Sequence, residues 1–458
     1  MRKVSALLMA SERRAISGLA GLYASRMLGL FMVLPVLALY ADALEGSTPL
    51  LVGFALGVYG LTQAVLQIPF GLLSDRIGRK RVIAFGLLVF AIGSVVAAMA
   101  DSIGGVIIGR ALQGGGAVAA AIMALLADQT REQVRTAAMA TIGLSIGISF
   151  GIAMVVGPWL ASWAGLSGVF WFTALLTLLG LVVLWRWVPP APRRLRHRDV
   201  GMDRQQVKSV ITRPDLWRLD LSIFTLHLVL MAIFVAVPFR LQEAGIPLAR
   251  HGLAYLGIMG LSFVAMVPLM IVAEKKQQIK VVCLLAIGAI TVSLGGLGSP
   301  FSHGHWLFVG LFIFFTGFNL LEATLPSMLS KLAPAGAKGT AMGVYSTSQF
   351  LGAFLGGTLG GLLANVWGLD AVFIGCAALA LLWWLAMWKM PSPPPLSSEV
   401  VDLNDAPPDT LDVLMERLAD VVGVEDVMVV PEEHLVYLKV NRQQLDRAAL
   451  ARLIPPKS

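Results

Sequence analysis

The chain alternates between long apolar stretches and short polar connections. A helix needs about 20 mostly apolar residues to cross the hydrocarbon core of a bilayer, so each long stretch predicts a membrane-spanning helix. Glycine and proline are frequent inside the stretches, which membrane helices tolerate because neighbouring helices satisfy the freed backbone groups. Twelve spans are predicted: residues 15–41, 50–74, 80–100, 103–127, 135–163, 167–188, 217–243, 250–273, 279–298, 304–332, 339–366 and 369–390.

Lysine and arginine are concentrated in every second connection. Cytoplasmic connections of membrane proteins carry an excess of these residues. Basic clusters precede the first span and follow spans two, four, six, eight and ten, whereas the opposite connections hold only Arg240 and Arg250 beside several acids. We therefore expect a multi-pass protein of the inner (cytoplasmic) membrane with both termini in the cytoplasm, which requires an even number of spans.

Composition agrees with a membrane protein and narrows its partners. Apolar residues make up 57% of the chain and charged residues 14%, against roughly 45–50% and about 25% in soluble domains. The net charge of +8 could suit nucleic acid, but the basic residues gather in connections on one side. We interpret the charge as a topology signal. We expect the lipid bilayer as a partner, including its anionic headgroups, and no nucleic acid.

Motifs of catalysis and metal binding are absent from the sequence. There is no nucleophile elbow, no GxxxxGK[ST] phosphate loop and no cluster of metal ligands. Cys283 and Cys376 fall inside apolar stretches and form no CxxC pair. We therefore expect no enzyme, no catalytic or metal-binding residues and no cofactor. The absence of a phosphate loop also argues against an ATP-driven pump, so any movement of a solute across the membrane would need an ion gradient, which we expect to be a proton gradient.

A polar, basic segment divides the spans into two sets of six. It covers residues 189–216 and separates an N-terminal half, 1–188, from a C-terminal half, 217–390. The two halves also contain a similar sequence pattern: Pro35 of span one and Pro238 of span seven each end a five-residue apolar run that begins with Phe. We therefore expect an all-α membrane protein of two related six-helix halves. This architecture is typical of alternating-access transporters with a site near the midplane.

The last part of the chain has the composition of a soluble domain. A Pro-rich linker, 391–398, leads into residues 399–458. A candidate strand near 399–403, helical spacing of leucines, two strand-like runs at 424–430 and 435–440, and Asn441 as the cap of a last helix predict the order β-α-β-β-α. This order resembles a small α+β ferredoxin-like module. The module contains no cysteine, so we expect no metal site. It could bind a regulator, self-associate or bind a small ligand.

One polar connection carries a specific motif. The segment GLLSDRIGRKR at the end of span two resembles the signature loop GxxxD(R/K)xGRK(R/K) of the major facilitator superfamily at every defined position. In that family the acid of the loop faces the N-terminus of span eleven, here near Gly339 and Thr340. The contact joins the halves and stabilises the outward-open state. The residues carried over to this conformational latch are Gly71, Asp75, Arg76, Gly78, Arg79 and Lys80.

The roles of single residues in this loop can be stated in physical terms. A carboxylate such as that of Asp75 is favourable at a helix N-terminus. The two arginines are expected to pair with nearby acids such as Asp128. A small residue such as Gly71 is expected to let another helix approach closely.

Two further motifs support the resemblance, which covers roughly residues 10–390. The RALQG run that begins at Arg110 resembles the family motif RxxQG. Gly157 and Pro158 in span five resemble part of the antiporter motif, although the glycines that usually follow are absent. The RMLG run that begins at Arg26 and the appended domain resemble the YajR-type drug/proton antiporters. The resemblance therefore implies antiport.

Polar side chains inside the spans are candidates for coupling and substrate binding, because a charge near the bilayer centre costs at least ~2.5–3.5 kcal/mol. Arg26 stays charged, so it could bind an anionic substrate or a carboxylate but cannot carry the proton. For Arg110 the resemblance implies a role in proton coupling, with helix packing as the alternative. His227 and Glu322 could each carry the proton, with packing as the alternative for His227. Candidate substrate-cavity residues are Tyr23, Arg26, Gln63, Gln113 and Asn319.

Other polar and small residues of the spans have a simpler interpretation. Interhelical hydrogen bonding is the alternative to a cavity role for Tyr59, Gln67, Tyr345 and Gln349. Close helix packing is favoured over a bending hinge for the glycines of span eleven, Gly343, Gly352, Gly356, Gly357, Gly360 and Gly361.

Three functions fit these features. The first is secondary active, proton-coupled efflux of small amphipathic compounds by alternating access, with a small-molecule substrate and protons as partners. The second is proton-coupled import of a small anion or nutrient, for which Arg26 and Arg110 would be suited. The third is a non-transporting membrane sensor with the C-terminal module as its output. The Asp75 latch argues against the third, because only alternating access needs a latch between the halves.

Overall fold

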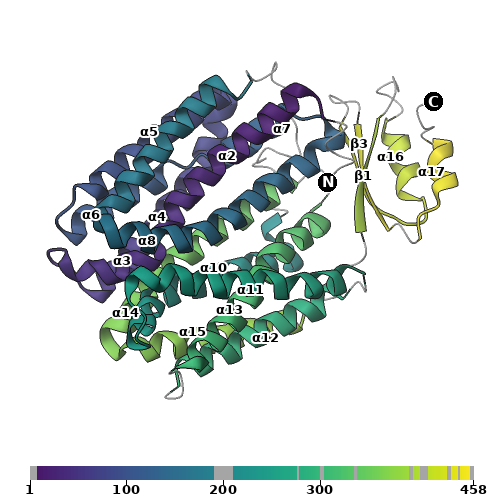
Figure 1. The fold of residues 1–458 in the computed structure, drawn as a ribbon. Helices are drawn as coiled ribbons and strands as arrows, with labels where there is room; N and C mark the ends of the chain where they lie inside the picture. Colours follow the sequence, from purple (N-terminus) through teal and green to yellow (C-terminus); the bar gives the residue numbers. More distant parts are fainter. Residues whose placement is uncertain are drawn as a thin grey trace.

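The protein forms two helical bundles and a small module with a three-stranded sheet (Figure 1). The predicted linkers at 189–216 and 391–398 lie mostly outside the described residues. The computed structural model describes residues 8–189, 210–275, 278–299, 304–334, 338–390, 396–402, 411–430, 435–441 and 444–453.

The N-terminal bundle holds the first six predicted spans. A kink at Gly165, with φ 63°, divides α8 into the predicted spans 135–163 and 167–188. Glycine adopts such a left-handed conformation at little cost, so α8 is two spans joined end to end. The elements are α2 (Ala10–Met32), α3 (Leu34–Tyr40), η1 (Ala41–Ala43), α4 (Pro49–Ile77), α5 (Arg79–Ala98), α6 (Ile103–Gly115), α7 (Ala119–Asp128) and α8 (Glu132–Arg186).

The C-terminal bundle holds the other six spans. Among the described residues, eleven helical stretches are long and apolar enough to cross a membrane. Because α8 contains two spans, the twelve predicted crossings agree with the structure. The helix of span seven begins at Pro214, before its predicted start, since proline is tolerated in the first turn. The helices are α10 (Pro214–Glu243), α11 (Leu248–Lys275), α12 (Ile279–Leu297), α13 (His305–Leu332), α14 (Lys338–Trp367) and α15 (Leu369–Trp388).

The two bundles approach each other closely at the ends of α4 and α14 that lie far from Asp75. A Cβ atom built on Gly53 would lie 2.2 Å from the carbonyl oxygen of Gly357, and one built on Gly57 would lie 2.5 Å from that of Phe354. Small residues permit such contact between membrane helices. In Figure 1 the bundles converge at this end, near α3 and α14, and diverge toward the strand module.

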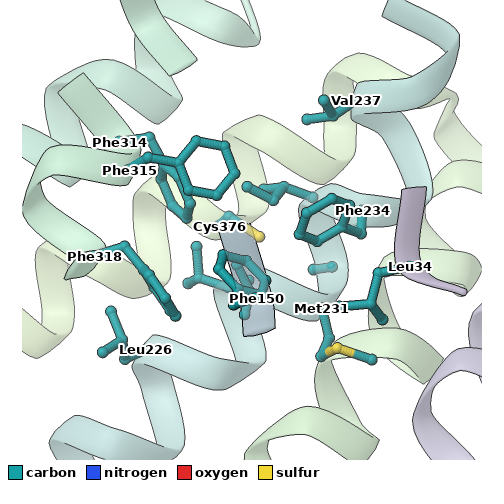
Figure 2. Packing of buried hydrophobic residues seen from close by; sticks show 14 of the residues in the cluster. Leu34, Phe150, Leu226, Met231, Phe234, Val237, Phe314, Phe315, Phe318 and Cys376 are labelled. Atoms are coloured by element: carbon teal, nitrogen blue, oxygen red, sulfur yellow. The ribbon is translucent and has the colours of Figure 1, made fainter. Parts of the chain in front are cut away.

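Aromatic side chains of both halves form a shared core beside this contact. The ring of Phe150 from α8 lies 6.4 and 6.1 Å, centroid to centroid, from Phe315 and Phe318 of α13. Figure 2 shows Phe150 between these rings and Phe234 of α10. Aromatic pairs at such distances contribute about 0.5–1.5 kcal/mol beyond the area that they bury. The core therefore joins the two halves through apolar contact.

The C-terminal module has a three-stranded antiparallel sheet in the order β1-β3-β2. One face of the sheet packs on its two helices around a small core of Leu418, Val436, Leu438 and Val440. The predicted order β-α-β-β-α is confirmed. The elements are β1 (Leu396–Asp402), α16 (Leu411–Ala419), β2 (Val424–Val430), β3 (Leu435–Asn441) and α17 (Arg447–Leu453).

The predicted cap of the last helix is wrong. Asp446 Oδ1 accepts hydrogen bonds from the backbone N–H groups of Ala448 and Ala449, at 3.0 and 2.9 Å. The side chain of Asn441 instead donates to Gln444. An aspartate directly before the first helical residue satisfies donors that the helix leaves free, so α17 begins later than the sequence predicted.

Candidate functional site

The motif loop joins α4 to α5 through Gly78. Its φ of 105° lies in a region that glycine adopts without strain. Directly after it, Arg79 donates to Ser74 Oγ at 2.7 Å and to Asp128 Oδ2 at 3.1 Å, and it forms an ion pair with Asp75. The predicted pairing of Arg79 with Asp128 is confirmed. The arginine thus holds the end of α4 to the end of α7.

Other residues of the motif contact the N-terminal half. Lys80 Nζ donates to the carbonyl oxygen of Val188 at 2.5 Å and lies 5.9 Å from the ring centroid of Trp185. A Cβ atom built on Gly71 would lie 3.5 Å from Cβ of Ala120. This is ordinary van der Waals contact, so Gly71 permits no unusually close helix approach in this conformation.

Asp75 lies on the side where the bundles diverge. Its carboxylate pairs with Arg79 of its own half, and its side chain is 43% exposed. The close approaches of α4 to α14 lie at the other end of these helices. The predicted contact of Asp75 with the start of α14 therefore stays a prediction for a second conformation, in which this side is closed.

The N-terminal half contains two fully buried arginines beside Tyr59. Arg26 of α2 is 1% exposed. Its Nη2 atom donates to Tyr59 Oη at 2.8 Å and to Gln63 Oε1 at 2.6 Å. The guanidinium carbon lies 5.9 and 5.6 Å from the ring centroids of Tyr59 and Phe90, within cation–π range. Its Nε and Nη1 atoms have no hydrogen-bond partner among the described residues.

Arg110 of α6 lies on the same tyrosine. Its guanidinium carbon is 5.2 Å from the ring centroid of Tyr59. Its Nη1 atom donates to Gln113 Oε1 at 2.9 Å, and Gln113 Nε2 donates to Ser94 Oγ at 2.8 Å. Longer contacts of 3.4 Å reach the carbonyl oxygens of Ala55 and Leu56. Of the predicted candidates, the structure therefore brings Arg26, Arg110, Gln63 and Gln113 into one buried region.

This region is positively charged. Neither arginine has an ion pair with a carboxylate in the part of the chain that the structure describes. A buried charge is costly unless it is paired or fully hydrogen-bonded. The candidate Tyr23 is also buried in this bundle. The N-terminal half thus offers uncompensated positive charge at the level of Tyr59.

The C-terminal half brings His227 and Glu322 together, which the sequence left as separate candidates. Gln349 Nε2 lies 2.8 Å from His227 Nε2 and 3.4 Å from Glu322 Oε1. His227 Nε2 lies 3.8 Å from Glu322 Oε2, and its Nδ1 lies 3.3 Å from the carbonyl oxygen of Ile223. With Nδ1 donating to that carbonyl, Nε2 accepts from Gln349, which is the pattern of a neutral imidazole. We call His227, Glu322 and Gln349 the acid cluster.

The remaining candidates lie in different places. Asn319 of α13 is buried one helical turn from Glu322, and its Nδ2 atom has no hydrogen-bond partner among the described residues. A Cβ atom on Gly157 would lie 2.5 Å from the carbonyl oxygen of Met32. Gly157, followed by Pro158, therefore sits where α8 crosses α2, away from the acid cluster.

Sequence reasoning missed Asp220. It lies in the second turn of α10, is 8% exposed, and its Oδ1 atom has no hydrogen-bond partner among the described residues. The sequence does contain a signal: Asp220 precedes His227 by seven residues, which puts both on one face of a helix. Its position near the start of a span is typical of an interfacial residue.

Comparison with known families identifies the class. The model of the Major Facilitator Superfamily matches residues 19–357 and 284–431, and the chain belongs to this family. Because its relatives are transporters, the chain is a multi-pass membrane transporter of the secondary type and not an enzyme.

Individual relatives narrow the resemblance. The inner membrane transport protein YajR of Escherichia coli (strain K12) is 47% identical over 445 residues, which cover 97% of each chain. The chain is a YajR-type protein in this sense, as the sequence indicated. An uncharacterised transporter of Buchnera aphidicola subsp. Acyrthosiphon pisum is 35% identical over 71% of this chain and 84% of its own. The multidrug resistance protein MdtH of Yersinia enterocolitica is 27% identical over 69% of this chain and 78% of its own.

Solved structures show the same fold at low identity. A bacterial homologue of the human lysosomal transporter Spinster, in an inward-facing and occupied conformation, has a TM-score of 0.68. The D-xylose–proton symporter has a TM-score of 0.66. The first is 13% identical and covers 83% of this chain and 97% of its own. The second is 17% identical and covers 83% of this chain and 98% of its own.

Proposed function

We propose that the protein exchanges protons for small amphipathic compounds and exports these compounds across the inner membrane by alternating access. The observation that carries the proposal is the acid cluster. Glu322 lies in a membrane-spanning helix, and its described neighbours are His227 and Gln349 rather than an arginine or lysine. A charged acid at the bilayer centre costs at least ~2.5–3.5 kcal/mol. Protonation of Glu322 neutralises the charge and removes this cost.

The arrangement of the halves supports alternating access. If the basic connections are cytoplasmic, the end that carries Asp75 faces the cytoplasm. Both termini are then also cytoplasmic. The present conformation is joined on the opposite side by the glycine contacts of α4 and α14 and by the aromatic core around Phe150. It corresponds to an inward-facing state, and closing the Asp75 side would produce the outward-facing one.

Efflux rather than import is favoured by the relatives. One relative is named a multidrug resistance protein, and the relative with the highest identity given above is named an inner membrane transport protein. The rings of Phe150, Phe315 and Phe318 also supply apolar surface between the halves. Separation of the halves would expose this surface to the apolar parts of an amphipathic compound, and pockets for such ligands are mostly apolar with few polar groups.

Everted membrane vesicles test this function. The vesicles are energised, a pH-sensitive dye follows their internal pH, and cationic, neutral and anionic amphipaths are added in turn. Proton release that follows one class of compound is expected in the wild type. Glu322→Gln should abolish it, and His227→Ala should weaken it because Glu322 remains.

A matched control removes an acid outside the membrane. Glu416 lies exposed on α16 of the module, and Glu416→Gln should behave as wild type. Undiminished proton release in Glu322→Gln would contradict the assignment of the proton to the acid cluster. A wild type that responds to none of the compounds would contradict efflux itself and favour the sensor.

A second candidate is proton-coupled import of a small anion. It is favoured by Arg26, whose Nε and Nη1 atoms lack partners among the described residues, because a guanidinium binds carboxylates and phosphates in a forked geometry. Right-side-out vesicles distinguish it. Proton uptake should follow addition of a small anion alone, without any amphipath, and should be lost in Arg26→Gln. This result would support import instead of efflux.

A further inference from the structure

The C-terminal half contains a second buried acid that the proposed function does not use. Asp220 of α10 is 8% exposed. Its Oδ1 atom has no hydrogen-bond partner in the part of the chain that the structure describes. Buried carboxyl groups are normally hydrogen-bonded, and an exception calls for an explanation.

A second buried oxygen without a hydrogen-bond partner among the described residues belongs to Tyr345 of α14, four residues before Gln349. Its phenol is fully buried and is within electrostatic reach of the carboxyl groups of both Glu322 and Asp220 and of the thiol of Cys283. Its hydroxyl oxygen also has no hydrogen-bond partner among the described residues, and neither has Glu322 Oε2. Three oxygen atoms from three helices of one bundle, each able to exchange a proton, are thus buried without a hydrogen-bond partner among the described residues.

These groups form a series that leads toward the Asp75 end of the protein. On α10, Asp220 precedes His227 by seven residues, which is two turns or about 10 Å along the helix axis. On α14, Tyr345 precedes Gln349 by four residues, about 6 Å and on the same face. Both helices begin at the Asp75 end, so Tyr345 and Asp220 lie nearer to that end than the acid cluster does.

We propose that Tyr345 and Asp220 form the route by which a proton passes between Glu322 and water on the Asp75 side. The proposal rests on the proposed function and assigns its proton path on one side of the membrane. Asp220 is the terminal exchange group, and Tyr345 is the relay between the two carboxyl groups.

The transfer needs no further reactant. Through bridging water molecules, protonated Glu322 gives a proton to the oxygen of Tyr345 while the phenol gives its own proton to the carboxylate of Asp220. Each O–H bond that breaks at a donor is matched by one that forms at an acceptor, and the phenol is regenerated. Asp220 then releases the proton to water, and uptake follows the reverse sequence.

The other charged and polar groups around Asp220 are engaged with other partners or exposed, so they do not compete with Asp220 and Tyr345 for the proton. On α10 itself, Arg218 is engaged with Asp215 at 3.6 Å. From the packed helices, α12 supplies the Cys283 thiol, which interacts with Thr324 Oγ1 at 3.6 Å. On α15, Trp383 donates to Ser222, which lies two residues after Asp220. The basic residue after the end of α15, Lys389, is exposed.

The test follows the proton itself and needs no transported compound. Time-resolved infrared spectroscopy of the purified full-length protein records the carboxylic acid band of Glu322, identified by its loss in Glu322→Gln, after light releases a caged proton. In Asp220→Asn and Tyr345→Phe the rise of this band is expected to be at least tenfold slower than in wild type. Asp220→Glu, which keeps a carboxyl group, is expected to restore the rate.

Asp215→Asn is the matched control, because Asp215 lies on the same helix one to two turns nearer its start and is bound to Arg218. It should leave the rate unchanged. A wild-type rate in Asp220→Asn would overturn the proposal, and so would equal slowing in Asp215→Asn. The Glu322 band could rise at the normal rate in wild type and slowly in Asp220→Asn, while the protein moves no compound in vesicles. This result would reject the proposed function, and the proton path would stand.

Discussion

At the scale of single residues, the motif loop shows which side chain is available for a new partner when the halves move. Arg79 binds Asp75, Asp128 and Ser74 in the present structure. All three partners belong to the N-terminal half, so these contacts need not change when the halves move. Asp75 is the partly exposed member of the group and is able to gain a new partner.

The first prediction concerns the charge of Asp75. In this conformation Asp75→Asn loses a partly exposed ion pair, which contributes about 0–1 kcal/mol. In the predicted second conformation it would also lose the expected interaction with the N-terminus of α14, about 0.3–1 kcal/mol when exposed and up to about 2 when partly buried. The variant should therefore favour the conformation open on the Asp75 side. Accessibility of single cysteines introduced on each side, to a membrane-impermeant thiol reagent, measures the shift.

The matched variant for this measurement is Asp215→Asn, which removes an acid of the second half near the same end of the bundle. It should leave accessibility on both sides as in wild type. Equal accessibility in Asp75→Asn and wild type would show that Asp75 is not a latch.

At the scale of elements, α14 is held between a helix of its own half and a helix of the other half. A Cβ atom on Gly356 would lie 2.1 Å from the carbonyl oxygen of Leu228 in α10. One on the adjacent Gly357 would lie 2.4 Å from that of Gly53 in α4. The glycines of span eleven therefore serve close packing, as favoured from the sequence, but on two faces with different partners.

The second prediction uses these adjacent glycines as a pair. Gly357→Val blocks a contact between the halves, which alternating access must break anyway, so the variant should fold and favour opening on the side away from Asp75. Gly356→Val blocks a contact inside one half, so it should lower the melting temperature in detergent. Cysteine accessibility and thermal unfolding, measured on both variants, separate the two effects. Equal destabilisation by both would contradict this division of the two faces.

At the scale of the whole molecule, the C-terminal module is attached to the helix that carries Glu322. Lys439 of β3 is buried, and its Nζ atom donates to the carbonyl oxygens of Ser330 and Lys331, at 3.2 and 2.5 Å. These carbonyls lie in the last turn of α13, where helices leave acceptors free and favour a cation. The module therefore caps the end of α13.

The third prediction follows from this contact. Lys439→Met removes the ammonium group but keeps much of the apolar stem, so the module should lose its fixed position on α13. Spin labels at the exposed positions Lys275 and Glu416 report the position, and their distance distribution should broaden. Arg417→Met, on an exposed residue of α16, should leave the distribution narrow. An unchanged distribution in Lys439→Met would show that other contacts hold the module.

Much of the architecture was determined by the sequence alone, because it depends on local patterns. Apolar stretches long enough to cross a bilayer predict the spans whatever their neighbours are. Two of these spans are joined end to end in α8, and the kink at Gly165 marks the boundary between them. The pairing of Arg79 with Asp128 and the order of the module were also predictable, since a motif and alternating patterns carry them. The cap at Asp446 was missed because Asn441, five residues earlier, is also of a residue type that is favoured as a helix cap.

Only the tertiary structure decided which polar groups meet. His227, Glu322 and Gln349 come from three helices, and no spacing along the chain brings them together. The same holds for the two arginines on Tyr59 and for Asp220 near Tyr345. Helix packing in a membrane is set by contacts between small residues rather than by burial of apolar surface, since lipid is as apolar as the helices. The sequence therefore determined that the helices cross the membrane, whereas their mutual contacts decided the site and the side on which the halves are closed.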